Sequence, residues 1–404
     1  MTSTIAFPAY VIGLMSGTSA DGVDAALIET DGRAQVRPLN HASIAYSDAL
    51  RQQILGAMRG EGDMDTIARA LTEIHAQAVE AVITASGLAR EQVALVGFHG
   101  QTIKHVPQEG YTVQIGHAQW LADAVGIPVV FDFRSNDMRH GGQGAPLVPL
   151  YHAALAATLP KPLMVVNIGG VANITWIGEN QINNEGGLTP PSREGALTPA
   201  ASGSAFGLRD VSLDCPLQAF DCGPGNALID DWVGQHTGAR CDMNGQIAKR
   251  GITEESRVKQ FLRDGFFVQN RARSLDRNQF SLSLVEGLSL EDGAATLTAM
   301  TAAAIAWSTR AVPEVPKQLL ITGGGRHNPV LMRMIEARTC SDVKARDCIV
   351  QPVEAVGWNG DMLEAEAFAY LAARSVQGLP LSLPSTTGVR EPVSGGELFV
   401  PAGK

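Results

Sequence analysis

The chain of 404 residues has few basic side chains and few aromatic ones. Its 31 Lys and Arg face 41 Asp and Glu, a formal net charge of −10, which makes nucleic acid and anionic membranes unpromising partners. Residues of the hydrophobic class make up 45% and charged residues 18%, with glycine spread throughout, so a disordered or fibrous chain is excluded. We expect a soluble globular protein that binds neither nucleic acid nor membrane.

Cysteine is scarce and odd in number. The five residues, at positions 215, 222, 241, 340 and 348, form no Cys-x-x-Cys pair, which argues against a disulfide framework and against a structural zinc site. No Lys or Arg precedes Arg33, and the apolar run from Val11 to Met15 is too short for a signal peptide or a membrane span. The sequence therefore predicts a cytoplasmic protein without a metal site of its own.

Glycine-rich hairpins open both halves of the chain. Apolar runs at 11–17 and 23–29 flank a turn, and the same arrangement returns at 163–168 and 171–177 around Gly169-Gly170. Further buried strands are predicted at 93–98, 127–133 and 319–322, and helices at 63–87, 294–310 and 362–373. Strands that alternate with helices predict an α/β fold, here a duplicated domain with a cleft between the copies.

We place the first domain at 1–137 and the second at 138–377, with the loop-like tail from 378 to 404 packing on the first. Residues 179–218 are rich in Gly, Pro, Ser and Asn and show no periodicity, so they are interpreted as an exposed or disordered insertion.

The first hairpin has the composition of a phosphate-binding turn. It consists of Gly17, Thr18, Ser19, Ala20, Asp21, Gly22, Val23 and Asp24, whose small side chains leave backbone N–H groups accessible. It is not a Walker A loop, since no Gly-Lys-Ser/Thr follows. An ordinary hairpin with no ligand is an equally good interpretation.

Two more glycine-rich segments are candidates. Asp221, at a predicted strand-to-loop junction before Cys222-Gly223-Pro224-Gly225, could act as a general base, although this segment alone favours a capping or turn role. Gly323, Gly324 and Gly325 end a strand before a helix and could approach an adenine or a phosphate; a tight turn explains them equally well.

The segment from Asp132 to Pro149 places two carboxylates and two arginines beside three glycines, which suits an oxygen-rich ligand with a carboxylate, since Arg can hold a carboxylate with two hydrogen bonds. A solvated loop with internal ion pairs is the alternative interpretation. His99, at a predicted strand end, and Glu364, in a predicted helix, are weaker candidates, because such residues more often have structural or solvated roles.

Taken in order, a set of short motifs resembles the anhydro-N-acetylmuramic acid kinase family, in the actin, heat-shock chaperone and sugar-kinase superfamily. The motifs are GLMSGTSADGVD, HGQTI, VQIG, DFRSND, GGQGAPLVP, VNIGGVANIT, FDCGPGN, TGGGRHN and EAEAFAYLA, and they extend from about residue 11 to residue 374. The resemblance implies two actin-like, ribonuclease H-like domains with the active site between them. It also implies a cytoplasmic homodimer.

The implied activity belongs to cell-wall recycling and amino-sugar catabolism: the 1,6-anhydro ring of 1,6-anhydro-N-acetylmuramic acid is opened with water and phosphorylated by ATP with Mg²⁺, giving N-acetylmuramic acid 6-phosphate. The matching motifs assign Gly17 to Asp24 and Gly169-Gly170 to the phosphates, Gly323-Gly324 to adenosine and Asp221 to the catalytic base. Arg134 is assigned to the lactyl carboxylate or a sugar hydroxyl, and His99 and Glu364 to the sugar side of the cleft.

This sequence departs from the family at Ala20, where relatives carry a larger apolar residue, and in the length of the 179–218 insertion. Three other functions stay open at this point. They are another sugar kinase of the superfamily, a nucleotide or polyphosphate hydrolase, and a catalytically silent nucleotide-binding regulator.

Overall fold

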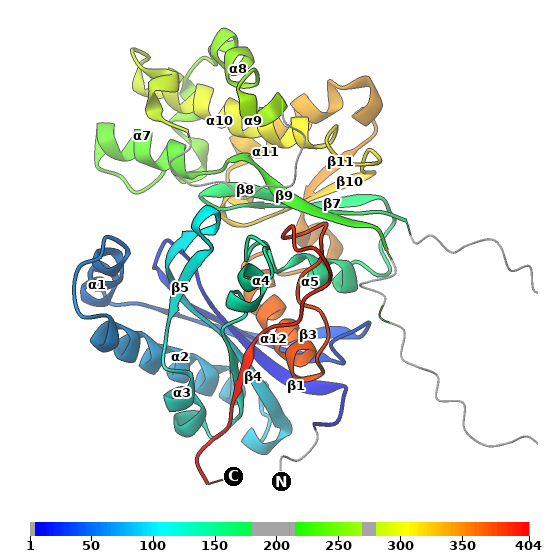
Figure 1. Ribbon diagram of the computed structural model, residues 1–404. Coiled ribbons are helices and arrows are strands. Elements are labelled where there is room, and N and C mark those ends of the chain that lie inside the picture. The colour runs from blue at the N-terminus through cyan, green and yellow to red at the C-terminus, as the bar shows by residue number, and fades with distance from the viewer. Residues whose placement is uncertain (1–4, 180–209, 211–214, 269–279, 404) are drawn as a thin grey trace, which may run out of the picture.

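The computed structural model describes residues 5–179, 210, 215–268 and 280–403, and within them the strands form two sheets (Figure 1). The first is seven-stranded in the order β12-β6-β4-β1-β2-β3, with β5 paired to β4. Its strands are β1 (Ala9–Ser16), β2 (Gly22–Thr30), β3 (Val36–Ala45), β4 (Val93–Val106), β5 (Tyr111–Ile115), β6 (Val129–Phe131) and β12 (Glu397–Phe399).

The second sheet repeats the plan of the first. In the described residues it is five-stranded, in the order β11-β10-β7-β8-β9. Its strands are β7 (Leu163–Ile168), β8 (Val171–Ile177), β9 (Leu217–Pro224), β10 (Gln318–Thr322) and β11 (Ile349–Pro352). In both sheets three consecutive strands run antiparallel, and the first of them pairs in parallel with a later strand. The expected duplicated α/β fold is confirmed.

Helices cover the outer faces of both sheets. On the first lie α1 (Asp48–Met58), α2 (Met64–Ser86) and α3 (Ala118–Val125); the second carries α7 (Ala227–Thr237), α8 (Glu255–Phe261), α9 (Gly265–Val268), α10 (Leu290–Ser308) and α11 (Pro329–Cys340). The predicted segment 63–87 forms α2 with a cap at each end: the Asp63 side chain accepts from the Thr66 N–H, and Gly87 ends the helix in the left-handed region. No helix among the described residues is long and apolar enough to cross a membrane.

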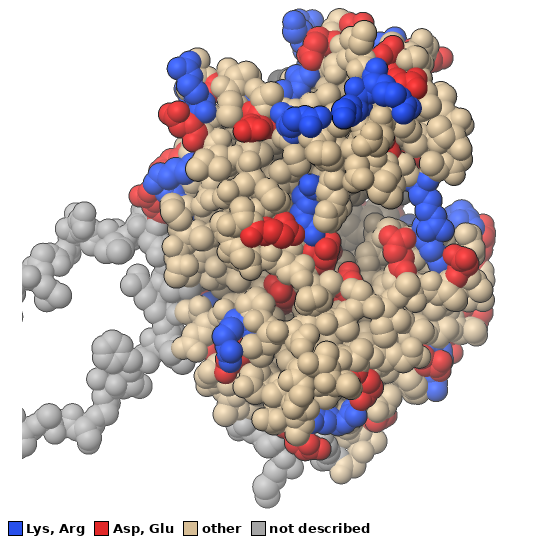
Figure 2. Space-filling view, turned by 180° about the vertical axis from the view of Figure 1, so that it is seen from behind, with Lys and Arg blue, Asp and Glu red and all other residues tan. Residues whose placement is uncertain are grey.

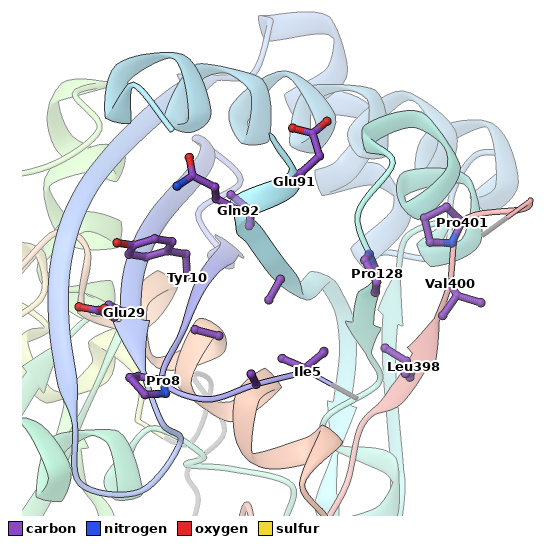
Figure 3. A pocket seen from close by; sticks show the side chains of 14 residues that line it. Ile5, Pro8, Tyr10, Glu29, Glu91, Gln92, Pro128, Leu398, Val400 and Pro401 are labelled. Atoms are coloured by element: carbon purple, nitrogen blue, oxygen red, sulfur yellow. The ribbon is translucent and has the colours of Figure 1, made fainter. Parts of the chain in front are cut away.

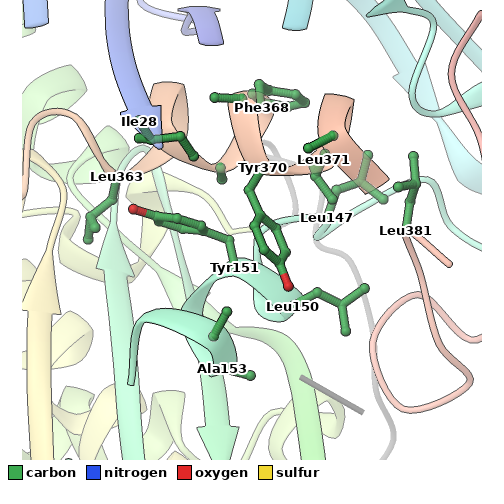
Figure 4. Close-up of a cluster of buried hydrophobic side chains, with 14 of the residues drawn as sticks. Ile28, Leu147, Leu150, Tyr151, Ala153, Leu363, Phe368, Tyr370, Leu371 and Leu381 are labelled. Carbon is green, nitrogen blue, oxygen red and sulfur yellow. The ribbon is translucent and has the colours of Figure 1, made fainter. Parts of the chain in front are cut away.

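Two further helices lie between the sheets. These are α5 (Pro149–Leu155) and α12 (Leu363–Val376), and Figure 4 shows Tyr151 of α5 and Tyr370 of α12 in the apolar cluster that joins the lobes. The sequence placed α12 in the second domain, but it packs on β1, β2 and β4 of the first sheet. The reason is that the apolar side chains of α12 pack against Val11, Ile28 and Leu95 on the inner face of the first sheet. The helix of one repeat therefore covers the sheet of the other.

The close approach of α12 depends on Gly13 of β1 and Gly97 of β4, which are register partners in the first sheet. A Cβ added to Gly13 would lie 1.9 Å from the Ala365 carbonyl oxygen, and one added to Gly97 would lie 2.1 Å from the Phe368 carbonyl oxygen. Because both obstacles are helix backbone, no rotamer change makes room for a side chain at either position.

The tail is more ordered than the loop-like composition indicates. It ends in β12, which pairs antiparallel with β6 at the edge of the first sheet. Before that, Leu381 and Val393 are buried and joined by a backbone hydrogen bond of 2.7 Å. Within 179–218, residues 180–209 and 211–214 lie outside the described residues, whereas Leu217 and Gln218 already belong to β9.

We expect Gly13→Ala to destabilise the fold by about 1–3 kcal/mol, the usual cost of overpacking, because the new methyl group meets the backbone of α12. Gly265→Ala is the matched control, since a Cβ there meets nothing within 4 Å. Urea unfolding of both variants measures the difference. Equal unfolding midpoints for the two variants would contradict the packing described.

A buried acid lies at the contact between α5 and α12. Tyr151 donates a hydrogen bond of 2.5 Å from its hydroxyl to Glu366, which is 4% exposed. Burial raises the pKa of Glu366 to about 7, although the hydrogen bond from Tyr151 lowers it in part. The folded protein therefore holds this proton more tightly than the unfolded chain does.

It follows that Glu366 stabilises the fold fully below about pH 4.5, and that this contribution is lost as the pH rises to about 7. We expect Glu366→Gln to remove a pH-dependent part of the unfolding free energy of up to about 3 kcal/mol between these limits. Tyr151→Phe keeps the titrating carboxyl and should keep the slope. Urea unfolding from about pH 5 to about pH 8 tests this, and an unchanged slope in Glu366→Gln would contradict it.

Candidate active site

The first hairpin is a turn over residues 17–21 between β1 and β2. Ala20 is buried, has a φ of 52° and donates its N–H to the Gly17 carbonyl at 3.1 Å. A residue branched at Cβ would be strained in this left-handed conformation, so a small side chain suits the turn as it stands here. Thr18 and Ser19 at its tip are exposed.

Three polar side chains hold this hairpin: Ser16 at the end of β1, Tyr46 directly after β3, and Gln101 within β4. Ser16 donates to Gln101 Oε1 at 2.6 Å, Tyr46 donates to the Ser16 hydroxyl at 3.0 Å, and Gln101 Nε2 donates to the Gly17 carbonyl at 3.1 Å. Burial raises the pKa of Tyr46, so its hydroxyl stays protonated. The sequence analysis missed Gln101 as a site residue. What could have indicated it is its polar carboxamide in HGQTI, directly after the apolar run at 93–98.

A hollow of about 840 Å³ separates the tip of this hairpin from α7 of the other lobe. Its lining residues are Thr18, Ser19, Asp21, Arg51, Leu55, Asp230, Asp231, Gly234, Gln235, Ala239, Arg240 and Cys241. Figure 2 shows the molecule hollowed between the lobes, with charged side chains along the rims. Arg51 approaches Asp21 at 3.4 Å, and Arg240 approaches Asp48 of the opposite lobe at 4.0 Å. The cleft expected between the copies is therefore present.

The second hairpin and the Gly323 turn form one unit in the second lobe. Asn226 donates its N–H to the Gly169 carbonyl at 2.7 Å, and Ala227 donates its N–H to the Gly170 carbonyl at 3.2 Å. Gly323 has a φ of 74°, and a Cβ there would lie 2.3 Å from Asn167 Oδ1. Gly324 lies beside the Asn226 carboxamide. Glycine is needed at 323 for both conformation and space.

Asp221 lies inside β9 rather than at the strand-to-loop junction that the sequence indicated. The pairing of β8 with β9 shifts register between Ala172 and Asn173, so that Cys222 is the extra residue of a bulge next to Asp221. A bulge lets a strand continue while it redirects the neighbouring side chain. Cys222 itself is fully buried, and burial raises the pKa of its thiol.

A row of polar side chains crosses the second sheet. Asp221 lies opposite Asn173, and Asn173 lies opposite Asn167, so the three side chains point to one face. That face is the one toward the other lobe, because Leu163 and Leu217, which share its parity, pack in the cluster that joins the lobes. The sequence analysis did not single out Asn167 or Asn173, although each interrupts an apolar strand.

Arg134 and His99 are brought together in the first lobe. Arg134 donates from Nε and Nη2 to His99 Nε2, at 3.2 and 2.9 Å, and from Nη1 to the Gly144 carbonyl at 2.7 Å. His99 lies within β4, which continues to Val106, and not at the predicted strand end, because residues 101–106 pair with β5. Its Nδ1 lies 2.9 Å from the Gly100 carbonyl, which requires the proton on Nδ1.

Burial and the charge of Arg134 lower the pKa of His99 well below its ordinary value, so the imidazole is neutral and accepts at Nε2. Burial lowers the pKa of Arg134 to about 10, whereas Glu364 and Asp137 oppose that shift, so the guanidinium remains charged.

Glu364 connects the lobes. It lies in the first turn of α12 and accepts a hydrogen bond of 3.1 Å from Asn167 Nδ2. Burial raises the pKa of Glu364, and Arg134 and Asn167 lower it in part. Burial also raises the pKa of Asp24, opposed by a hydrogen bond of 2.6 Å from Ser43. Glu364 is thus hydrogen-bonded to the polar row of the second sheet and close enough to Arg134 of the first lobe for the two charges to affect each other's pKa.

A separate cavity of about 690 Å³ opens at the other end of the first sheet, where β1 and β4 begin (Figure 3). Its lining is mostly aliphatic and contains none of the predicted site residues. The candidate site is therefore the interlobe cleft, at the carboxyl ends of the parallel strands.

The chain thus has two α/β lobes of the same topology, with a glycine-rich hairpin in each and a cleft between them. The family model described as anhydro-N-acetylmuramic acid kinase matches residues 9–186 and 206–401. The chain therefore belongs to the anhydro-N-acetylmuramic acid kinase family, and the family predicted from the motifs is confirmed.

Relatives of the same name are similar over nearly their whole length. The anhydro-N-acetylmuramic acid kinase of Paramagnetospirillum magneticum is 44% identical over 393 residues, 96% of this chain and 99% of the relative. That of Acidiphilium cryptum is 44% identical over 402 residues, 97% of this chain and 98% of the relative.

Solved structures give more distant matches. The activator of 2-hydroxyisocaproyl-CoA dehydratase from Clostridium difficile with bound ADPNP has a TM-score of 0.41 at 12% identity, over 91% of this chain and 96% of its own. A ROK family glucokinase from Streptomyces griseus with glucose and AMPPNP has a TM-score of 0.39 at 14% identity, over 91% of this chain and 100% of its own.

We expect the imidazole of His99 to stay neutral, with the proton on Nδ1, throughout the range from about pH 6 to about pH 8. In Arg134→Ala the pKa of His99 should rise, because one of the charges that depress it is removed. ¹⁵N-resolved NMR of the imidazole nitrogens measures both, with His99→Gln for assignment. A protonated ring at neutral pH in the unmodified protein would contradict the hydrogen-bond directions given above.

Proposed function

We propose that this chain opens the 1,6-anhydro ring of 1,6-anhydro-N-acetylmuramic acid with water and phosphorylates the 6-hydroxyl with ATP, in cell-wall recycling. The observation that supports this best is the polar row from Asp221 to Asn167, which a hydrogen bond extends to Glu364, a residue whose charge acts on Arg134 of the first lobe. A phosphoryl transfer alone needs no water-activating base. A carboxylate on the cleft face supplies one for ring opening.

In the proposed reaction Asp221 takes a proton from a water molecule. The water oxygen bonds to the anomeric carbon, and the bond between that carbon and the 6-oxygen breaks, with its electron pair going to the 6-oxygen. That oxygen bonds to the γ-phosphorus as the bond from phosphorus to the leaving ADP oxygen breaks. The leaving group of the ring opening is thus the nucleophile of the phosphoryl transfer, and the proton on Asp221 returns to solvent.

On the sugar side, we assign Arg134 to the lactyl carboxylate or a sugar hydroxyl. Its bonds to His99 and Gly144 leave two further N–H groups for a ligand, and their planar arrangement suits a carboxylate. The neutral His99 is an acceptor that fixes the guanidinium without adding a second positive charge. Glu364, held by Asn167, is assigned to the sugar hydroxyls.

For the nucleotide, we assign the backbone from Gly17 to Asp24 and at Gly169-Gly170 to the phosphates, and Gly323-Gly324 to adenosine. The space beside Gly324, where an added Cβ would meet, among the described residues, only Asn226 Nδ2 at 3.8 Å, fits a close approach of a flat ring or a phosphate. In the described residues no group of three or more His, Cys, Asp or Glu converges as a metal site. This fits Mg²⁺ held largely by phosphates and water, and when bound it supplies neutralisation of phosphate charge.

The homodimer implied by the family resemblance, like the cytoplasmic location, stays a prediction. Sedimentation equilibrium would measure the oligomeric state.

We expect Asp221→Asn to lose about 10²–10⁴ in turnover while it still binds the sugar, because the base is removed and the shape of the side chain is kept. Asp123→Asn is the matched control, an exposed Asp of the first lobe. Purified protein is incubated with Mg-ATP and 1,6-anhydro-N-acetylmuramic acid in ¹⁸O-water, with glucose and no-sugar controls, and ADP release and product mass are measured together.

A product that gains one phosphoryl group and one ¹⁸O at the anomeric carbon supports the proposal. ADP release without this product would contradict it and would point to a hydrolase or another sugar kinase. Binding of ATP without any ADP release would indicate the silent regulator. Normal turnover by Asp221→Asn would exclude Asp221 as the base.

A further inference from the structure

A short segment of the tail contacts both sides of the cleft. We call residues 383–387 the tail strap. The strap accepts a hydrogen bond of 2.9 Å from the Gln143 N–H to the Thr387 carbonyl, and one of 3.0 Å from the Ala219 N–H to the Ser385 carbonyl. Gln143 lies in the loop after Arg134, and Ala219 lies two residues before Asp221 in β9. The strap thus joins the segments that carry two of the proposed site residues.

The Thr387 side chain reaches Arg134 through a chain of hydrogen bonds. Its hydroxyl, in a residue only 1% exposed, donates to Asp137 Oδ2 at 2.5 Å. The other oxygen of that carboxylate accepts the Gly144 N–H at 2.6 Å. The Gly144 carbonyl then accepts from Arg134 Nη1 at 2.7 Å. The carboxylate of Asp137 therefore holds the N–H of Gly144, the residue whose carbonyl accepts from the guanidinium.

The residues around this series of hydrogen bonds are tightly packed. A Cβ on Gly142 would lie 2.2 Å from Asp137 Oδ1 and 2.5 Å from Val389 Cγ1, so the loop is packed tightly between the carboxylate and the tail. The strap is itself closed by bonds from the N–H groups of Thr386 and Thr387 to the Leu383 carbonyl, at 3.0 and 3.1 Å. Among the described residues, the Thr386 hydroxyl bonds inside the strap, to the N–H and the carbonyl of Leu383.

We propose that Thr387 is a positioning residue for the sugar. Through Asp137 and Gly144 it sets the direction of the Arg134 guanidinium, so the tail strap determines how well the cleft binds the acidic group of the substrate. The inference rests on the proposed function. It differs from a purely structural role of the tail, because a structural role would change stability and would leave sugar binding in the folded protein as it was.

The first test compares three variants of the full chain. Thr387→Val loses the donor at nearly constant volume, and we expect the KM for the anhydro sugar to rise about tenfold, the effect of about 1.4 kcal/mol, with the KM for ATP unchanged. Thr387→Ser keeps the donor and should restore the sugar KM. Thr386→Val removes a hydroxyl of similar burial that does not contact Asp137, so it should lower the unfolding midpoint without raising the sugar KM.

A second variant tests the same pathway in case Thr387→Val does not fold. Asp137→Asn keeps the shape of the side chain but replaces one acceptor oxygen with an NH₂ group, and it should also raise the sugar KM. A double-mutant cycle with Arg134→Ala then isolates the pathway. In the Arg134→Ala background, Thr387→Val should add no further increase in the sugar KM.

An equal sugar KM in Thr387→Val and the unmodified protein would overturn the proposal. So would additive effects of Thr387→Val and Arg134→Ala on the sugar KM, or the same KM change in Thr386→Val. These outcomes are distinguishable from failure of the proposed function, which would be seen as absence of the phosphorylated sugar product with the unmodified protein.

Discussion

Two adjacent glycines determine how the lobes of this protein are joined. Gly13 and Gly97 are partners across β1 and β4, and they let the backbone of α12 rest directly on the first sheet. At this distance the helix also reaches α5 and the second sheet, in one apolar cluster that spans both lobes. A side chain at either position would push α12 outward, and with it every residue that the helix brings to the cleft.

The geometry of the candidate site follows from that contact, because α12 carries Glu364 in its first turn and apolar packing residues behind it. Glu364 reaches Asn167 of the second sheet, and Phe368, one turn later, packs its ring 4.5 Å from the ring of His99. The helix thereby holds Glu364 and His99 in a fixed relation although they belong to distant parts of the chain. The site is rigid because it is built on a helix and two sheets and not on loops alone.

Local patterns were enough to predict the hairpins, the bounds of α2 and the duplicated topology, since each depends on neighbouring residues. The motifs also identified the family. Contacts between distant segments could not be predicted: nothing in the sequence near Thr387 indicates that it bonds to Asp137, and the composition of the tail gave no sign of β12. Asp221 was placed at a loop for the same reason, because the bulge that redirects it is a property of how β8 and β9 pair.

The pKa shifts in the cleft have one common cause, which is the removal of water. Burial raises the pKa of Asp24 and Glu364 and lowers that of Arg134 and His99, so each shift disfavours the charged form. In such surroundings a remaining charge interacts more strongly with a ligand than it would in water. Arg134 keeps its charge because Glu364 and Asp137 offset the burial and because its nearest ring partner is a neutral acceptor. The scaffold therefore holds a buried cation whose direction is fixed by its hydrogen bonds to His99 and Gly144.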